Sequence, residues 1–116
     1  MSYKLLVIFC FAFLVFANKA NAQNPSLERG KNVYTIFCQS CHGENGEGMP
    51  GAFPPLAKTN RLKDTKRLVD IIKKGMTGEI TVLGNKYNAE MSAVDLSDQE
   101  VADVVHYIRK SWGNKY

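Results

Sequence analysis

The sequence predicts an all-α domain whose core is built mainly by three short helices. Apolar residues recur at helical spacing in three separate stretches, and each stretch carries a start or stop signal for a helix. The connections are rich in glycine and proline, which disfavours regular structure there. A very short β-hairpin, with strands over residues 80–83 and 86–87, is the single extended element that we expect; Gly84-Asn85 would form its turn.

The first predicted helix begins at Ser26, a capping residue after Pro25, and runs towards Cys38. Its apolar face consists of residues at helical spacing: Leu27, Gly30, Tyr34, and Phe37 or Cys38. The segment that follows, residues 43–57, is rich in glycine and proline, and we expect it to be irregular.

The second and third predicted helices have clearer boundaries. The second covers residues 65–74, between a capping Asp64 and a terminating Gly75. Its expected buried residues are Leu68, Ile71 and Ile72. The third starts at a capping box, Ser97 to Glu100, in which the two side chains satisfy free backbone N–H groups of the first turn. Its apolar face is expected to comprise Val101, Val104, Val105, Ile108 and Trp112, with Gly113 as its end.

The chain opens with the pattern of a secretory signal peptide. Lys4 precedes an unbroken apolar run of thirteen residues, Leu5 to Ala17, and a small-x-small cleavage site ends at Ala22. The alternative is a retained membrane anchor, but thirteen residues at about 1.5 Å each span roughly 20 Å, short of the ~30 Å hydrocarbon core. We therefore expect cleavage after Ala22 and one domain over residues 23–116. The mature protein would be periplasmic, with peripheral or no membrane association.

The mature chain would be small and nearly neutral. Its 94 residues suffice for one domain. Loss of Lys4 and Lys19 leaves 13 basic against 11 acidic residues, a net charge of +2 instead of the +4 of the full chain. A nucleic-acid-binding domain needs a far stronger basic excess, so we expect no nucleic-acid partner.

The motif that carries chemistry is Cys38-Gln39-Ser40-Cys41-His42, which has the C-x-x-C-H form of covalent haem attachment. The two thiols would add across the two vinyl groups of the porphyrin, and the two intervening residues match the spacing of the sulfurs to those vinyls. His42 follows directly, so that its Nε2 can bind iron while its other nitrogen donates to a carbonyl group. The motif predicts one haem c bonded to Cys38 and Cys41, with His42 as an axial iron ligand.

Three other uses of a cysteine pair fit less well. A thioredoxin-like redox pair needs a nearby βαβ pattern, which the sequence lacks. A zinc site would have only three local ligands, because the other histidine, His106, lies far away on the third helix. A structural disulfide is the ordinary expectation outside the cytoplasm, but it leaves His42 and the glycine-rich segment unexplained.

The second axial ligand stays open on spacing alone. A soft or nitrogen donor has to approach from the other side of the ring, and the candidates are Met49, Met76, Met91 and His106. Met49 follows His42 by only seven residues and has little chain with which to pass round the macrocycle. His106 falls between the apolar and polar faces of its helix, as a surface residue would. Met76 and Met91 both lie in loops after the second helix, and spacing does not choose between them.

A series of short matches along the mature chain carries a family resemblance. They are Gly30-x-x-x-Tyr34-x-x-x-Cys38, the C-x-x-C-H motif, His42-Gly43-x-x-Gly46-x-Gly48, Pro54-Pro55-Leu56, Tyr87-Asn88-x-x-Met91, Leu96-Ser97-Asp98, Tyr107-Ile108-Arg109 and Trp112-Gly113-Asn114. With these residues the sequence resembles a class I cytochrome c, close to the short bacterial monohaem kind. The resemblance implies the cytochrome c fold, with three main helices around one covalently bound haem. Gly30 and Tyr34 match positions where the first helix crosses the last near Tyr107, and a residue without Cβ allows close approach.

The resemblance also implies roles for residues of the haem site. Met91 matches the axial methionine of the family, which favours it over Met76 as the second iron ligand. Pro54 matches the proline whose carbonyl accepts the N–H of the axial histidine, and Leu56 matches a leucine that packs on the haem. One departure is Ser92, which stands where many relatives have proline and would leave the ligand loop less rigid.

The function that the resemblance implies is electron transfer, without enzymatic activity of its own. Iron with both axial positions filled has no position for a substrate, so we expect a monomeric electron carrier between a redox protein donor and a redox protein acceptor. Two alternatives stay open. One is a haem-c protein with a labile sixth ligand that acts as a peroxidase or gas sensor, and the other is an electron-transfer subunit of a larger periplasmic oxidoreductase. A basic run, either a partner patch or a solvated helix face, comprises Arg61, Lys63, Lys66, Arg67, Lys73 and Lys74.

Overall fold

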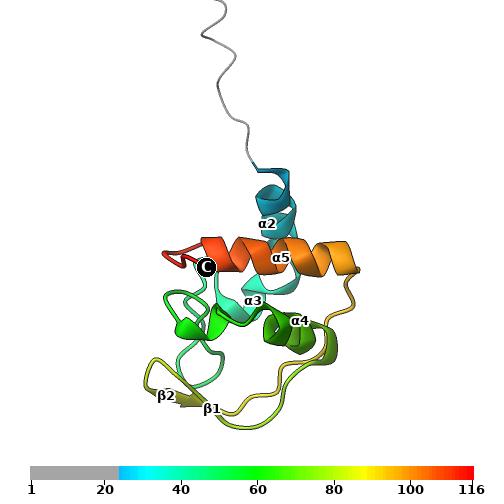
Figure 1. The fold of residues 1–116 in the computed structure, drawn as a ribbon. Helices are drawn as coiled ribbons and strands as arrows, with labels where there is room; N and C mark the ends of the chain where they lie inside the picture. Colours follow the sequence, from blue (N-terminus) through cyan, green and yellow to red (C-terminus); the bar gives the residue numbers. More distant parts are fainter. Residues whose placement is uncertain (1–23) are drawn as a thin grey trace, which may run out of the picture.

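Residues 24–116 are described by a computed structural model, and they form a mostly helical fold with one small antiparallel sheet (Figure 1). The predicted fold class, three main helices and a short hairpin, is confirmed. The predicted signal peptide, residues 1–22, lies outside the described residues. Within them, no helix is long and apolar enough to cross a membrane. The elements in chain order are α2 (Pro25–Phe37), α3 (Gln39–His42), the 3-10 helix η2 (Asn60–Leu62), α4 (Thr65–Lys74), β1 (Ile80–Val82), β2 (Asn85–Tyr87) and α5 (Asp98–Lys110).

The start of α2 differs slightly from the prediction, because its cap is Asn24 and not Ser26. The Asn24 side-chain oxygen accepts a hydrogen bond from the backbone N–H of Ser26 at 3.1 Å. Pro25 suits the first helical position, since no N–H is needed there and its fixed φ matches the helix. The predicted apolar face is confirmed at Gly30 and Tyr34, which are buried. Of the two alternatives at its end, Cys38 packs against the core and Phe37 is exposed.

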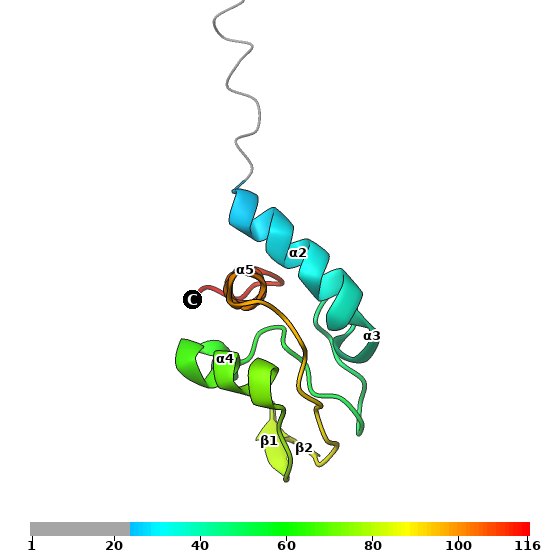
Figure 2. The same cartoon turned by 90° about the vertical axis from the view of Figure 1, so that its right-hand side faces the viewer.

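α2 and α5 cross steeply and form the main helix–helix contact of the fold (Figures 1 and 2). They approach closely at Gly30, where a Cβ atom would lie 2.1 Å from the Asp103 carbonyl oxygen and 2.7 Å from the Tyr107 Cβ. A side chain at position 30 would therefore force the helices apart. Beside the crossing, the rings of Tyr34 and Tyr107 pack with their centroids 5.7 Å apart. The close approach predicted for this part of the first helix is confirmed.

The hydrophobic core lies where α2, α4 and α5 meet. Its buried members are Val33, Tyr34, Leu62, Leu68, Ile72, Val101, Val104, Val105 and Ile108. α4 has the predicted boundaries: the Asp64 carboxylate accepts a hydrogen bond from the Arg67 backbone N–H at 3.0 Å, and Gly75 follows the last helical residue. Its apolar face thus points into the same core as that of α5.

α5 starts as predicted but ends before Trp112. Both halves of the capping box are present: the Ser97 hydroxyl accepts from the Glu100 N–H at 3.2 Å, and the Glu100 carboxylate accepts from the Ser97 N–H at 2.8 Å. The helix stops at Lys110, so the prediction that Trp112 belongs to its apolar face is wrong. The Trp112 ring instead packs against Tyr34, with centroids 4.9 Å apart, from a turn in which the Trp112 φ is +53°.

The hairpin is present, but its turn lies one residue earlier than predicted. β1 and β2 pair with Val82 opposite Asn85, so Leu83 and Gly84 form the two-residue loop. Their φ angles are +48° and +81°, and a two-residue hairpin loop of this kind needs positive φ at both positions. This register buries the side chains of Val82 and Tyr87 on the inner side of the ribbon.

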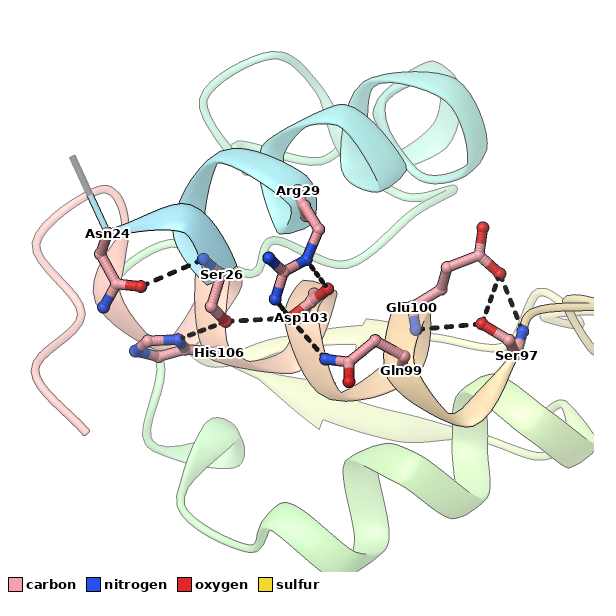
Figure 3. Close-up of polar contacts among 8 residues, drawn as sticks. All are labelled: Asn24, Ser26, Arg29, Ser97, Gln99, Glu100, Asp103 and His106. Atoms are coloured by element: carbon pink, nitrogen blue, oxygen red, sulfur yellow. Dashed lines mark hydrogen bonds and ion pairs between the residues drawn. The ribbon is translucent and has the colours of Figure 1, made fainter.

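A buried carboxylate ties α2 to α5 (Figure 3). Asp103 is 2% exposed and accepts hydrogen bonds from Arg29 at 2.7 and 3.1 Å, from Ser26 at 3.0 Å and from Gln99 at 3.0 Å. The Ser26 oxygen also lies 3.0 Å from His106 Nδ1. Because the serine proton goes to the carboxylate, the His106 ring donates to the serine oxygen. The Arg29 guanidinium, through its hydrogen bonds, holds the pKa of Asp103 below its ordinary value.

Candidate haem-binding site

Two apolar cavities with common walls lie between α3, α4, the hairpin and the segment before α5. The side chains that line both are Cys38, His42, Pro54, Met76, Ile80 and Met91. Core residues such as Leu68, Ile72 and Val82 complete the wall of the first cavity. A flat, largely apolar group that extends through both cavities would therefore touch both the C-x-x-C-H motif and the two methionines.

The C-x-x-C-H motif lies on a turn of helix that the sequence did not predict as a separate element. Cys38 ends α2, and α3 begins with the next residue and ends at His42. Both Cys38 and Cys41 are free thiols and line the second cavity. Burial, with the nearby Cys41 as a smaller cause, raises the pKa of the Cys38 thiol to about 11. Cys38 is therefore protonated at neutral pH in the unligated chain.

His42 is buried and has one of its ring nitrogens committed to the backbone. Nδ1 lies 2.9 Å from the carbonyl oxygen of Pro54. Since a carbonyl can only accept, Nδ1 carries the proton and Nε2 is the nitrogen available to a metal. Burial lowers the pKa of His42, and the hydrogen bond to Pro54 opposes this effect. The imidazole is thus neutral, as a metal ligand has to be.

The irregular segment 43–57 is fixed by backbone hydrogen bonds. The Gly48 N–H donates to the His42 carbonyl at 2.7 Å, and the Leu56 N–H donates to the Gly46 carbonyl at 2.8 Å. At Gly46, where φ is +64°, a Cβ would lie 2.4 Å from the Trp112 ring. Glycine is required there by both the backbone conformation and the aromatic neighbour. The segment brings Pro54 and Leu56 to the cavity wall.

The four candidates for the second iron ligand are separated by their positions. Met76 and Met91 line both cavities, and they form an antiparallel bridge in which each N–H donates to the carbonyl of the other, at 2.8 and 2.9 Å. Met49 is 52% exposed and bridges to Phe53. His106 is hydrogen-bonded to Ser26, on the side of α5 that faces α2. The position of these side chains favours the two methionines equally.

Two arginines at the first cavity were not assigned a role from the sequence. Arg61 and Arg67 line it, and Arg61 also donates to the Thr81 carbonyl at 3.3 Å. They are the members of the basic run that face an apolar cavity, where a guanidinium could hold a carboxylate of a bound group. Three other members are paired at the surface: Lys66 and Lys74 with Asp70, and Lys73 with Asp98. Their pairing weakens the case for the run as a patch that attracts an acidic partner.

Comparison with known proteins gives one consistent result. A family model described as cytochrome c matches residues 27–112. A cytochrome c-552 of Thermus thermophilus is 39% identical over 109 residues, which cover 89% of this chain and 70% of that protein. A second Thermus thermophilus cytochrome c-552 is 42% identical over 91 residues, covering 73% of this chain and 69% of that protein. The cytochrome c subunit of an alcohol dehydrogenase (quinone) from Gluconacetobacter polyoxogenes is 32% identical over 103 residues, 85% of this chain but 22% of that subunit.

Proposed function

The chain belongs to the cytochrome c family, and from this premise we propose that it is an exported electron carrier with one haem c. The carriers of this family bind haem c covalently and pass single electrons. The observation that carries the finer proposal is that the thiols of Cys38 and Cys41, the imidazole of His42 and the side chains of Met76 and Met91 all line the second cavity. Of the two methionines, the family resemblance favours Met91.

Each wall of the cavities has a residue suited to one part of the cofactor. Cys38 and Cys41 would form the two thioether bonds, and His42 Nε2 and the Met91 sulfur would ligate the iron. Leu56 would pack on the ring. Arg61 and Arg67 would hold the propionate carboxylates, a further proposal that rests on their position at the first cavity. When bound, haem c supplies one-electron chemistry through its iron.

The chain itself controls the environment of that chemistry. The Pro54 carbonyl orients the His42 ring and keeps the proton on Nδ1, so that Nε2 remains unprotonated. Apolar side chains such as Leu68 and Ile72 line the first cavity and would keep water from a group bound there. An apolar surrounding disfavours additional positive charge, and a thioether ligand favours ferrous iron, so both raise the reduction potential.

Covalent attachment can be tested by extraction of the cofactor. The protein is made in cells with a competent haem-maturation system, denatured, and treated with acidified organic solvent. We expect the haem to stay with the wild-type chain, whereas a Cys38→Ala, Cys41→Ala chain should release it. Native protein that contains no haem would refute the whole proposal.

A second candidate is an electron-transfer subunit of a larger periplasmic oxidoreductase. The similarity to the alcohol dehydrogenase (quinone) cytochrome c subunit supports it, although this chain spans about a fifth of that relative. In either case we propose redox proteins as donor and acceptor. Gel filtration of a periplasmic extract separates the two candidates: a free carrier elutes as a monomer, and a subunit elutes with its complex.

A further inference from the structure

Gly75, the residue that ends α4, packs directly against the backbone of Met91. A Cβ atom at position 75 would lie 2.6 Å from the Met91 carbonyl oxygen and 2.9 Å from the Ala93 nitrogen. These neighbours are backbone atoms, which cannot turn aside as the end of a flexible side chain can. The missing side chain of Gly75 therefore makes room for the Met91 peptide.

The same segment is joined to the end of α4 by three backbone hydrogen bonds. Two form the bridge between Met76 and Met91, at 2.8 and 2.9 Å, and the third runs from the Val94 N–H to the Ile72 carbonyl at 2.8 Å. The residue after Met91, Ser92, is exposed and has no ring to restrict its backbone. The backbone contacts with the end of α4 thus hold the chain on both sides of Met91, in addition to the packing of Met91 and Val94 against the core.

Gly75 also caps the end of α4, and a helix cap of this kind commonly is glycine. This capping role has to be distinguished from the close approach of Gly75 to the Met91 backbone. The φ of Gly75 is +78°, and its N–H donates to the Ile71 carbonyl at 2.8 Å. Positive φ alone favours glycine at such a position. Gly78 has a similar demand, with φ of +94°, but a Cβ there would meet no atom within 4 Å. Gly75 and Gly78 therefore share a positive φ and differ in their approach to the Met91 backbone.

We propose that Gly75 is a positioning residue for the Met91 sulfur, in addition to its role as a helix cap. Because Gly75 has no Cβ, the Met91 peptide can pack against the end of α4. This packing fixes the position of the Met91 backbone and so the direction from which its side chain reaches the two cavities. A Cβ would displace the Met91 carbonyl and strain the hydrogen bond that this carbonyl accepts from Met76. The methionine would then leave the iron more often. This inference rests on the proposed ligand role of Met91.

The test compares the ferric holoproteins of the wild type, Gly75→Ala and Gly78→Ala. Three quantities are measured: the weak far-red band of methionine–iron ligation, the affinity for added imidazole, and the thermal unfolding temperature. For Gly75→Ala we expect a weaker band and imidazole binding about tenfold tighter, because the affinity of a competing ligand rises in proportion to the methionine-free fraction. Gly78→Ala should match the wild type in band and imidazole affinity.

The outcomes separate positioning from capping. A lower unfolding temperature in Gly75→Ala, with the band and the imidazole affinity unchanged below the transition, would show a cap only and overturn the proposal. A wild-type protein that binds haem but lacks the band would refute Met91 as ligand, and with it this inference. If Gly75→Ala incorporates no haem, hydrogen exchange of backbone amides in the wild-type holoprotein tests whether the Met91 peptide is held against the end of α4. The Met76 and Met91 amides should exchange much more slowly than that of Ser92. Equal exchange rates would show that the bridge does not hold the Met91 peptide against the end of α4, and would overturn the proposal.

Discussion

At the residue scale, the environment of His42 accounts for most of what the site can do. Its hydrogen bond to Pro54 assigns the proton to Nδ1, and its burial lowers its pKa, so the free Nε2 is a neutral donor. Met76 and Met91 line the same cavities as His42 and are joined by one backbone bridge. Because the bridge is made by backbone groups, alanine at either position keeps it. Removal of each side chain therefore reports on the sulfur and leaves the loop in place.

Substitution of the two methionines identifies the ligand. In Met91→Ala we expect the far-red band of the ferric protein to disappear and the reduction potential to fall by on the order of 0.1 V, within the ~0.8 V range over which axial ligands set haem potentials. The fall follows from loss of a thioether that favours ferrous iron. Met76→Ala is the matched control, and it should leave both quantities nearly unchanged. The reverse pattern would assign the ligand to Met76.

The parts of the site that sequence could predict are those that are contiguous in the chain. The C-x-x-C-H motif places two thiols and an imidazole by adjacency alone, so no tertiary structure is needed to interpret it. The roles proposed for Arg61 and Arg67 depend on how η2 and α4 face the first cavity, and a run of basic residues contains no such information. Sequence spacing also does not choose between Met76 and Met91 as the iron ligand. The fold brings both residues to the same place, in one backbone bridge.

At the scale of the elements, two helix starts could be predicted from hydrogen bonds within the first turn, whereas the end of α5, which tertiary packing sets, could not. The capping Asp64 and the box at Ser97 bond within their own first turns, and both starts were predicted correctly. The end of α5 is different, because Asn114 folds back to donate to the carbonyls of Ile108 and Leu56. This return turns the chain after Lys110 and takes Trp112 out of the helix.

The buried carboxylate at the α2–α5 crossing predicts a specific pH dependence. The folded-state pKa of Asp103 is lowered, chiefly by hydrogen bonds from Arg29, so the stabilisation is fully present above the ordinary carboxyl pKa. It is lost as pH falls through the lowered value, when the carboxylate becomes protonated. Asp103→Asn should cost about 1–3 kcal/mol near neutral pH, as expected for a hydrogen-bonded charge, and less in acid.

Thermal unfolding between about pH 7 and about pH 3 measures this effect, since ordinary carboxyl groups titrate near pH 4. The gap in unfolding temperature between wild type and Asp103→Asn should narrow as the pH falls. Asp70→Asn is the matched control: its partners Lys66 and Lys74 are exposed, and exposed pairs contribute little. A gap for Asp103→Asn that stays constant with pH would contradict the assigned charge state.

At the scale of the whole molecule, the core and the candidate site are not separate. Tyr34, Leu68, Ile72 and Ile108 belong to the hydrophobic core and also line the first cavity. α2, α4 and α5 meet on one side of these residues, while the hairpin and the segment 89–94 close the second cavity. The packing of the helices therefore continues across the cavity wall, and a group that fills the cavities would complete the core.

This shared wall predicts that the chain without haem is largely disordered, with α5 at most partly formed. A domain of this size has a marginal core, and an apolar cavity left empty removes contacts from several of its members. The glycine-rich segment over residues 43–51 adds a cost of roughly 1–2 kcal/mol per residue for ordering its backbone. Haem binding would supply the missing free energy, because a ligand of the native state stabilises that state alone.

The measurement is circular dichroism of a Cys38→Ser, Cys41→Ser double variant purified without haem, with the wild-type holoprotein as reference. We expect low helix content and no cooperative thermal transition in the variant. The two serines themselves should not unfold the chain, since Cys41 is exposed and Cys38 half-buried, and serine is close to cysteine in size. Near-native helix content with a cooperative transition would show that α2, α4 and α5 form a sufficient core by themselves. In that case the cavities would be a preformed site, and haem binding would add little to folding.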